Sequence, residues 1–289
     1  MLNRKIVDQY TPGKEQGFLG EGHIARSLLS GNFLQSDPFI FLMDDDIHKK
    51  DFSPTGGPHP HAGFETVSLL IEGKIQESAE SIEKGGFQIM TAGSGIVHTE
   101  TIREPTKARL FQLWLTLPTA DRWAMPRLQI LEADRVPSST QDGIGIRVYS
   151  GSFGGLTSPM KNYVPLIVAE VTLEAGKAAT FNIPANFNAF MAVISGNIEV
   201  GLEKQMLNTD EVGWLNHIDE DGPSELHLQG GSQDARIVIY AGEPQRTGII
   251  SHGPFIAEKE DQIQKLYKDY RLGIMKHIAA SPKAQRITY

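Results

Sequence analysis

Residues 59–73 read HPHAGFETVSLLIEG, a pair of histidines followed by an apolar run that ends at a glycine. Valine, isoleucine, leucine and phenylalanine are frequent in this run, and these residues favour buried β-strands. Similar apolar runs, bounded by Gly, Pro, Asn or Asp, recur at residues 108–118, 165–173 and 235–244. Short runs of this kind along most of a chain are typical of an all-β sandwich or barrel. We therefore predict an all-β fold.

Two stretches of the chain follow one plan, which indicates an internal duplication. Residues 65–76 and residues 189–200 each read as an apolar strand, a turn that contains glycine and a second strand. Repetition of this kind predicts two related β-domains. Because a stretch rich in glycine and proline lies between them, we predict domains at residues 1–134 and 163–289 with a linker at residues 135–162.

The end of the chain has a different pattern. Residues 258–279 carry apolar and aromatic side chains at helical spacing, and Gly273 would weaken a helix there. The residues at this spacing are Ile263, Leu266, Tyr267 and Tyr270. The pattern predicts one C-terminal α-helix of about four turns.

Composition excludes several classes of protein. The chain has 289 residues, of which 40% are hydrophobic and 21% are charged, the balance of a globular protein. Its net charge of −8 argues against direct nucleic-acid binding, because phosphate binding needs a basic surface. The chain has no cysteine, which excludes disulfides, thiolate-bound metals and a cysteine nucleophile.

The sequence also lacks the features of secreted and membrane proteins. The first residues, MLNRKIVDQYTPG, do not contain the apolar core of a signal peptide. No apolar run approaches the ~20 residues that a membrane helix needs. We expect a cytoplasmic protein that does not bind membranes.

Two pairs of polar residues have the spacing of metal ligands. His59 and His61 lie two positions apart, so both side chains point to the same face of a strand. Pro60 cannot donate a ladder hydrogen bond, which predicts a strand start or an edge strand. His98 and Glu100 form a second pair of the same spacing. If the two pairs lie on facing strands, they supply three nitrogens and one oxygen to a metal ion and leave positions open.

Such a mixed set of imidazole and carboxylate ligands suits Fe(II), with Mn, Ni, Cu or Zn as competitors. One pair alone is a weak signal, since two neighbouring histidines are often a surface feature. Glu65 follows the first pair closely, and it is either a further ligand or an acceptor for an imidazole N–H. Asn186 and Asn188 stand in the second repeat where histidines would be needed, so we predict no metal site there. We interpret the remaining histidines as surface or structural residues: His23, His48, His217, His227, His252 and His277.

Four segments together resemble a known family. HPHAGFETVSLLIEG, MTAGSGIVHTE, FQLWLTLP and AGEPQRTGIISHGPF resemble, in this order, the signature segments of the pirins, which are two-domain members of the cupin superfamily. The resemblance extends over residues 37–258 and the C-terminal helix. It implies two cupin barrels (double-stranded β-helix or jelly-roll barrels) packed face to face, with one metal ion, usually iron, in the N-terminal barrel. It carries the ligand role to His59, His61, His98 and Glu100, and Glu65 is generally not a ligand in this family.

The chain departs from the family at two positions. Ala62 and Ser94 stand where pirins usually have arginine. Because both lie beside ligand segments, we expect them to change the charge of the pocket or its rim and to make it less favourable for anionic substrates.

The resemblance implies two functions. Some pirins are quercetin 2,3-dioxygenases, which open a flavonol ring with O₂, and others are redox-sensitive proteins that bind transcription factors or metabolic enzymes. We therefore expect a metal-dependent dioxygenase with a small aromatic substrate, and a non-catalytic redox or metal sensor with a protein partner is the alternative. In the first case Glu100 is the candidate catalytic base for the flavonol hydroxyl. Phe64 either lines the substrate pocket or is an ordinary core residue. We expect a monomer in both cases.

Overall fold

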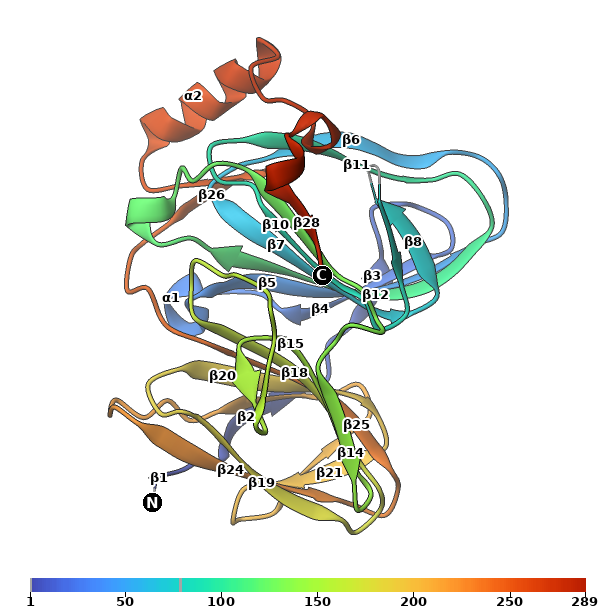
Figure 1. The fold of residues 1–289 in the computed structure, drawn as a ribbon, viewed down its shortest axis with the longest axis vertical. Helices are drawn as coiled ribbons and strands as arrows, with labels where there is room; N and C mark the ends of the chain where they lie inside the picture. The colour runs from blue at the N-terminus through green and yellow to red at the C-terminus, as the bar shows by residue number, and fades with distance from the viewer. Residues whose placement is uncertain (1, 78–79) are drawn as a thin grey trace. The chain divides into compact units, whose positions relative to one another are not determined.

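The computed structural model describes residues 2–77 and 80–289, and the chain forms two compact β-units (Figure 1). One unit consists of residues 13–135 and 245–289, and it is called the N-terminal barrel below. The other unit consists of residues 1–12 and 136–244, and it is called the C-terminal barrel. The two β-units and a C-terminal helix confirm the predicted fold class.

The N-terminal barrel is built from two sheets. The larger sheet has the order β28-β13-β10-β7-β12-β5-β4-β3, and the smaller has the order β6-β11-β8-β9. The strands of the larger sheet are β3 (Lys14–Gln16), β4 (His23–Leu29), β5 (Phe39–Lys49), β7 (Phe64–Glu72), β10 (Phe87–Thr91), β12 (Thr106–Thr116), β13 (Arg127–Leu131) and β28 (Arg286–Thr288). Those of the smaller sheet are β6 (Thr55–His61), β8 (Lys74–Glu77), β9 (Glu80–Glu83) and β11 (Ile96–Ile102). The short helix α1 (Phe33–Ser36) and the hairpin of β26 (Ile250–His252) and β27 (Phe255–Ala257) complete this unit.

The C-terminal barrel repeats this plan. Its larger sheet has the order β14-β15-β18-β25-β20-β23-β2, and its smaller sheet has the order β1-β24-β21-β22 with β19 also paired to β24. The strands of the larger sheet are β2 (Ile6–Tyr10), β14 (Ser138–Gln141), β15 (Ile144–Ser150), β18 (Leu166–Leu173), β20 (Asn188–Ser195), β23 (Val212–Leu215) and β25 (Ala235–Gly242). The others are β1 (Leu2–Asn3), β16 (Ser152–Phe153), β17 (Leu156–Thr157), β19 (Ala178–Pro184), β21 (Asn197–Val200), β22 (Gln205–Asn208) and β24 (Pro223–Gly230).

The predicted duplication is visible in one turn of each barrel. Gly73 joins β7 to β8 with φ +81°, and Gly196 joins β20 to β21 with φ +74°. A Cβ atom on Gly73 would lie 2.0 Å from the carbonyl oxygen of Lys107, and one on Gly196 would lie 1.9 Å from that of Asp234. Both the backbone conformation and the close approach require glycine, so the two strand pairs are built in the same way.

The structure divides the chain differently from the predicted domain boundaries. Residues 138–157 form strands of the C-terminal barrel and are not a linker. The first twelve residues belong to the C-terminal barrel, because β1 pairs with β24 and β2 pairs with β23. Arg4 anchors this segment: it is fully buried and donates to Ser224 Oγ at 2.8 Å and to the carbonyl of Ala185 at 2.7 Å. Strand pairing, which the sequence pattern does not contain, sets these boundaries.

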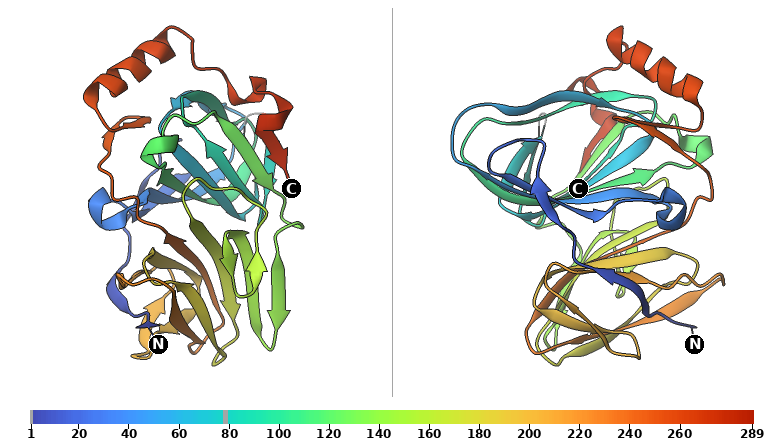
Figure 2. Two further views of the ribbon diagram at one scale, coloured as in Figure 1. Left: turned by 60° about the vertical axis from the view of Figure 1, so that its left-hand side comes forward. Right: turned by 180° about the vertical axis from the view of Figure 1, so that it is seen from behind.

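The predicted C-terminal helix is present but shorter. Helix α2 spans Glu260–Arg271, and its amide at Leu272 still donates to Lys268. Gly273 has φ +69°, a left-handed conformation that ends the helix. The chain then returns to the N-terminal barrel, where β28 pairs with β13 (Figure 2). Within the described residues, no helix has the length and apolar character needed to cross a membrane.

The interiors of the two units differ. In the C-terminal barrel, one apolar cluster extends across both sheets, from Phe181 and Ile183 to Met191 and Ile239. The N-terminal barrel also buries many apolar side chains, such as Phe39, Leu69 and Leu113, and among the described residues it buries more polar side chains than the C-terminal barrel does. Those used below are His23, Asp44, Asp45, His61, Glu65 and His98.

Candidate metal centre

The predicted ligands lie on two strands that are hydrogen-bonded to each other. His59 and His61 end strand β6, and His98 and Glu100 lie on strand β11. The antiparallel register places His98 directly opposite His59. The two pairs therefore come from adjacent, directly paired strands of one sheet. Neighbouring strands bring the side chains together because directly opposed residues share a face.

The side chains form one cluster. His59, His61 and His98 offer nitrogens that all lie within 4.8 Å of one another. The Nε2 atoms of His59 and His98 are 2.8 Å apart. Glu100 lies beside them, with carboxylate oxygens 3.7 Å from His59 Nε2 and 3.9 Å from His98 Nε2. The structure thus brings the four predicted residues into one site.

The protonation of the cluster suits a metal ion. Burial and the neighbouring imidazoles lower the pKa of His98 to about 3, and they lower the pKa of His61 well below its ordinary value. Both rings are therefore uncharged at neutral pH, which is the form that binds metals. His59 Nδ1 lies 3.0 Å from the carbonyl oxygen of Gly57, so Nδ1–H donates and Nε2, which faces His98 Nε2, is the nitrogen that carries the lone pair. The uncharged rings of His61 and His98, together with Nε2 of His59 and the carboxylate of Glu100, fit a divalent cation.

Aromatic side chains support His61 from one side. The Trp114 ring lies 5.2 Å from the His61 ring, and the Phe64 ring lies 5.2 Å from His61 and 4.1 Å from Trp114. Phe64 is completely buried. It therefore packs against a candidate ligand and does not line an open pocket, which was one of the two predicted roles.

Glu65 is not part of the cluster. It neighbours Phe64 on β7, and since successive strand side chains alternate between faces, Glu65 points away from His61. Its carboxylate accepts a hydrogen bond of 2.6 Å from Thr91 Oγ1. The predictions that Glu65 is a metal ligand or accepts from an imidazole are therefore wrong. Burial raises the pKa of Glu65 to about 7.

The two positions that depart from the family pattern also lie outside the cluster. Ala62 is completely buried against Phe255, Ile263 and Leu266, because its side chain alternates with that of His61. Ser94 is exposed in the turn between β10 and β11, where its amide donates to the carbonyl of Ala124. The prediction that Ala62 changes the charge of the pocket is wrong, since its side chain faces the packing of helix α2.

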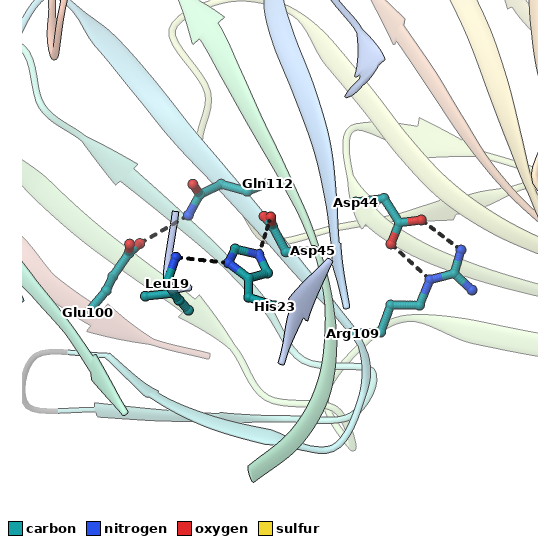
Figure 3. A network of polar contacts seen from close by, with 7 residues as sticks. All are labelled: Leu19, His23, Asp44, Asp45, Glu100, Arg109 and Gln112. Carbon is teal, nitrogen blue, oxygen red and sulfur yellow. Dashed lines mark hydrogen bonds and ion pairs between the residues drawn. The ribbon is translucent and has the colours of Figure 1, made fainter. Parts of the chain in front are cut away.

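A pocket adjoins Glu100, and the sequence pattern did not indicate its polar residues. Gln112 Nε2 on β12 donates to Glu100 Oε1 at 3.0 Å (Figure 3). His23 on β4 and Asp45 on β5 form a buried pair at 2.8 Å in the same pocket. No local spacing signals this pair, because strand pairing in the larger sheet brings together residues that are 22 positions apart.

Comparisons with known proteins agree with this architecture. The family model described as "Pirin" matches residues 23–115, and the model "Pirin C-terminal cupin domain" matches residues 168–276. A Pseudomonas aeruginosa protein provisionally named quercetin 2,3-dioxygenase is 32% identical over 273 residues, which cover 89% of this chain and 93% of that protein. Human pirin is 30% identical over 280 residues, which cover 94% of each chain.

Solved structures show the same fold. The crystal structure of GK1651 from Geobacillus kaustophilus has a TM-score of 0.77 and 29% identity, and the match covers 86% of this chain and 99% of that one. A quercetin 2,3-dioxygenase from Acinetobacter baumannii has a TM-score of 0.83 and 23% identity, with 94% and 98% covered. The two matched family models, the relatives and the paired barrels lead to one conclusion: this chain is a member of the pirin family and contains two cupin domains.

Proposed function

We propose that the N-terminal barrel binds one divalent metal ion, Fe(II), through His59, His61, His98 and Glu100, and that it opens flavonols such as quercetin with O₂. One observation carries the proposal: three imidazoles and a carboxylate converge beside a pocket in the N-terminal barrel. Nitrogen and oxygen donors without thiolate suit Fe(II), and Mn, Ni, Cu and Zn are the competing ions. The names of the Pseudomonas and Acinetobacter proteins give the same reaction class.

The residues of the site have separable roles in this reaction. A bound iron ion would supply the Lewis acidity and the redox chemistry that dioxygen activation requires. Glu100 is the base that takes the proton of the flavonol 3-hydroxyl. Gln112 holds Oε1 of Glu100 by a hydrogen bond of 3.0 Å, and this fixes the orientation of the carboxylate. Trp114 and Phe64 hold the His61 ring in place.

An aerobic assay of the iron-loaded protein tests this function. The substrate is quercetin, and the readouts are the loss of flavonol absorbance and the release of carbon monoxide. We expect turnover that depends on iron and is abolished by Glu100→Ala. His227→Ala is the matched control, because His227 lies in the C-terminal barrel, where it is hydrogen-bonded to Thr180 and is not part of the proposed metal site. A protein with a full iron site and no turnover contradicts the dioxygenase and favours the redox-sensing alternative, in which the metal state governs binding of a protein partner.

A further inference from the structure

The pocket beside Glu100 has apolar walls and a polar end. Leu19, Ile47 and Leu110 line it together with Ile75 and Ile102. Its free volume is about 30 Å³. This is room for about two water molecules or for the hydroxyl-bearing edge of an aromatic ring, but not for a whole flavonol.

The polar end is the pair His23–Asp45, whose hydrogen bonds define its proton positions (Figure 3). The amide of Leu19 donates to His23 Nδ1 at 3.2 Å, so Nδ1 carries no proton. His23 Nε2–H therefore donates to Asp45 Oδ1 at 2.8 Å. Gly17 packs on the same ring, where a Cβ atom would lie 2.2 Å from Nδ1. These contacts hold the imidazole and the carboxylate in one orientation.

Asp44, the residue before Asp45, is a carboxylate with a structural role in the same sheet. Asp44 accepts two hydrogen bonds of 2.9 Å from Arg109 (Figure 3). It also lies 2.8 Å from Arg26 Nη2. Two guanidinium groups thus satisfy its oxygens. Asp44 and Asp45 are adjacent on β5 and point to opposite faces of the sheet.

Asp45, in contrast, is not paired with a guanidinium group in the part of the chain that the structure describes. Among the described residues, its carboxylate accepts a side-chain hydrogen bond only from His23, although an ionised carboxylate has about four acceptor sites. Its side chain is 9% exposed and lines the pocket. Burial raises the pKa of Asp45 because few groups compensate its charge. A buried carboxylate with free acceptor sites is stabilised by a ligand that donates a hydrogen bond.

An exposed aromatic side chain marks the edge of the pocket. Phe18 lines it and is 71% exposed, with its ring edge-on to His23 at 5.4 Å. Exposed rings of this kind offer a face for another flat ring. The pocket therefore combines an aromatic edge, aliphatic walls and, besides Glu100, the buried carboxylate of Asp45 as a hydrogen-bond acceptor.

We propose that Asp45, positioned by His23, accepts a hydrogen bond from a second hydroxyl of the substrate while the reacting hydroxyl lies at Glu100. The inference rests on the proposed flavonol reaction and specifies its substrate class: planar phenols that carry a second hydroxyl besides the one that reacts. Asp45 is then a residue that determines specificity. A methoxy group in this position has no proton to donate.

Binding to the zinc-loaded protein tests the subsite without turnover. The ligands are quercetin and 3-hydroxyflavone, which keeps the reacting hydroxyl and lacks the others, and the readout is fluorescence quenching. We expect the wild-type protein to bind quercetin about 10- to 100-fold more tightly than 3-hydroxyflavone. Asp45→Asn should remove this preference and leave the affinity for 3-hydroxyflavone and the metal content unchanged. Asp46→Asn, the same change at the next and exposed residue of β5, should preserve it.

The outcomes separate the subsite from the proposed function. Equal affinity of the wild-type protein for the two ligands overturns the subsite and leaves the flavonol function standing, and this comparison needs no variant. An equal loss of affinity for both ligands in Asp45→Asn also overturns the subsite, because it indicates a structural role. Binding of neither ligand by the wild-type protein overturns both proposals.

Discussion

The two barrels have the same arrangement of strands, and they differ in the side chains that their smaller sheets carry. In the N-terminal barrel, β6 and β11 present His59, His61, His98 and Glu100. The strands β19 and β24 of the C-terminal barrel are paired in the same antiparallel way. Their side chains in the apolar cluster are Phe181, Ile183, Leu226 and Leu228. The comparison shows that one architecture accommodates either apolar packing or a polar centre.

This difference has an energetic consequence. Apolar side chains stabilise a barrel by burial, whereas buried imidazoles and carboxylates need partners to offset the loss of hydration. Apolar burial stabilises both barrels, and the N-terminal barrel in addition buries His61 and His98 of the proposed metal centre. The following predictions test this contrast, from the largest effect to the smallest.

Removing two ligands should abolish metal binding. His61→Ala with His98→Ala leaves one imidazole and Glu100, too few donors to retain an ion through purification. We expect metal analysis to give no stoichiometric metal in the double variant. His227→Ala, in the C-terminal barrel, should retain the wild-type content. A double variant that still carries one ion per chain would place the metal elsewhere.

The metal should stabilise one barrel and not the other. Metal at about a thousand times its Kd adds about 4 kcal/mol to the stability of the unit that binds it. Hydrogen exchange of backbone amides can follow the two units separately, and we expect greater protection of β6 and β11 when metal is added. The amides of β19 and β24 serve as the internal control. An equal gain in both units would refute the assignment of the metal to the N-terminal barrel.

Glu65 should make the stability of the N-terminal barrel depend on pH. Its pKa rises to about 7 from the ordinary 4.5 because of burial, so the folded state binds this proton more tightly than the unfolded state. Protonation of Glu65 therefore stabilises the folded state. This stabilisation is fully present below pH 4.5 and is lost as the pH rises through about 7, and it changes the free energy of unfolding by on the order of 3 kcal/mol in total. In Glu65→Gln, the free energy of unfolding measured with urea should depend less on pH between 4.5 and 7 than it does in the wild-type protein.

The control for this prediction lies on the same strand. Glu72 is exposed at the end of β7, so Glu72→Gln should leave the pH dependence as it is in the wild-type protein. A wild-type protein whose stability does not fall between pH 4.5 and 7 would contradict the raised pKa.

The turn glycines should respond alike in both barrels. Gly73→Ala and Gly196→Ala each force a side chain into a left-handed conformation against a carbonyl oxygen, at a cost of about 1–3 kcal/mol or more. Gly155→Ala separates the two causes, because Gly155 has φ +80° and no atom within 4 Å of the added Cβ. Urea denaturation measures all three variants. A large effect in one barrel alone would mean that the turns are not equivalent.

The sequence predicted the parts of this molecule that depend on short-range patterns. The spacing of His59, His61, His98 and Glu100 gave the candidate ligands, because alternation along a strand is local. Asp45 and His23 could not be found in this way, since their meeting depends on the pairing of β4 with β5. The domain boundaries were wrong for the same reason: the partners of β1 and β2 lie far along the chain. Glu65 and Ala62 were misjudged because adjacency in sequence to a ligand does not place a side chain on its face.

Residues 1–12 belong to the C-terminal barrel, and residues 245–289 belong to the N-terminal barrel. This assignment determines which barrel is completed first during protein synthesis. A nascent chain that has reached residue 244 contains all four proposed ligands and every residue of the C-terminal barrel. It still lacks residues 245–289, from which Ile256 donates to Ala62 at 3.0 Å and Lys276 accepts from Val97 at 2.9 Å. Residues 13–135 of the N-terminal barrel are translated before most of the C-terminal barrel, but the N-terminal barrel is the unit completed last. The proposed metal site can reach its finished geometry only after residues 245–289 have been made, so a stop codon before residue 245 would damage a site whose ligands all lie within residues 59–100.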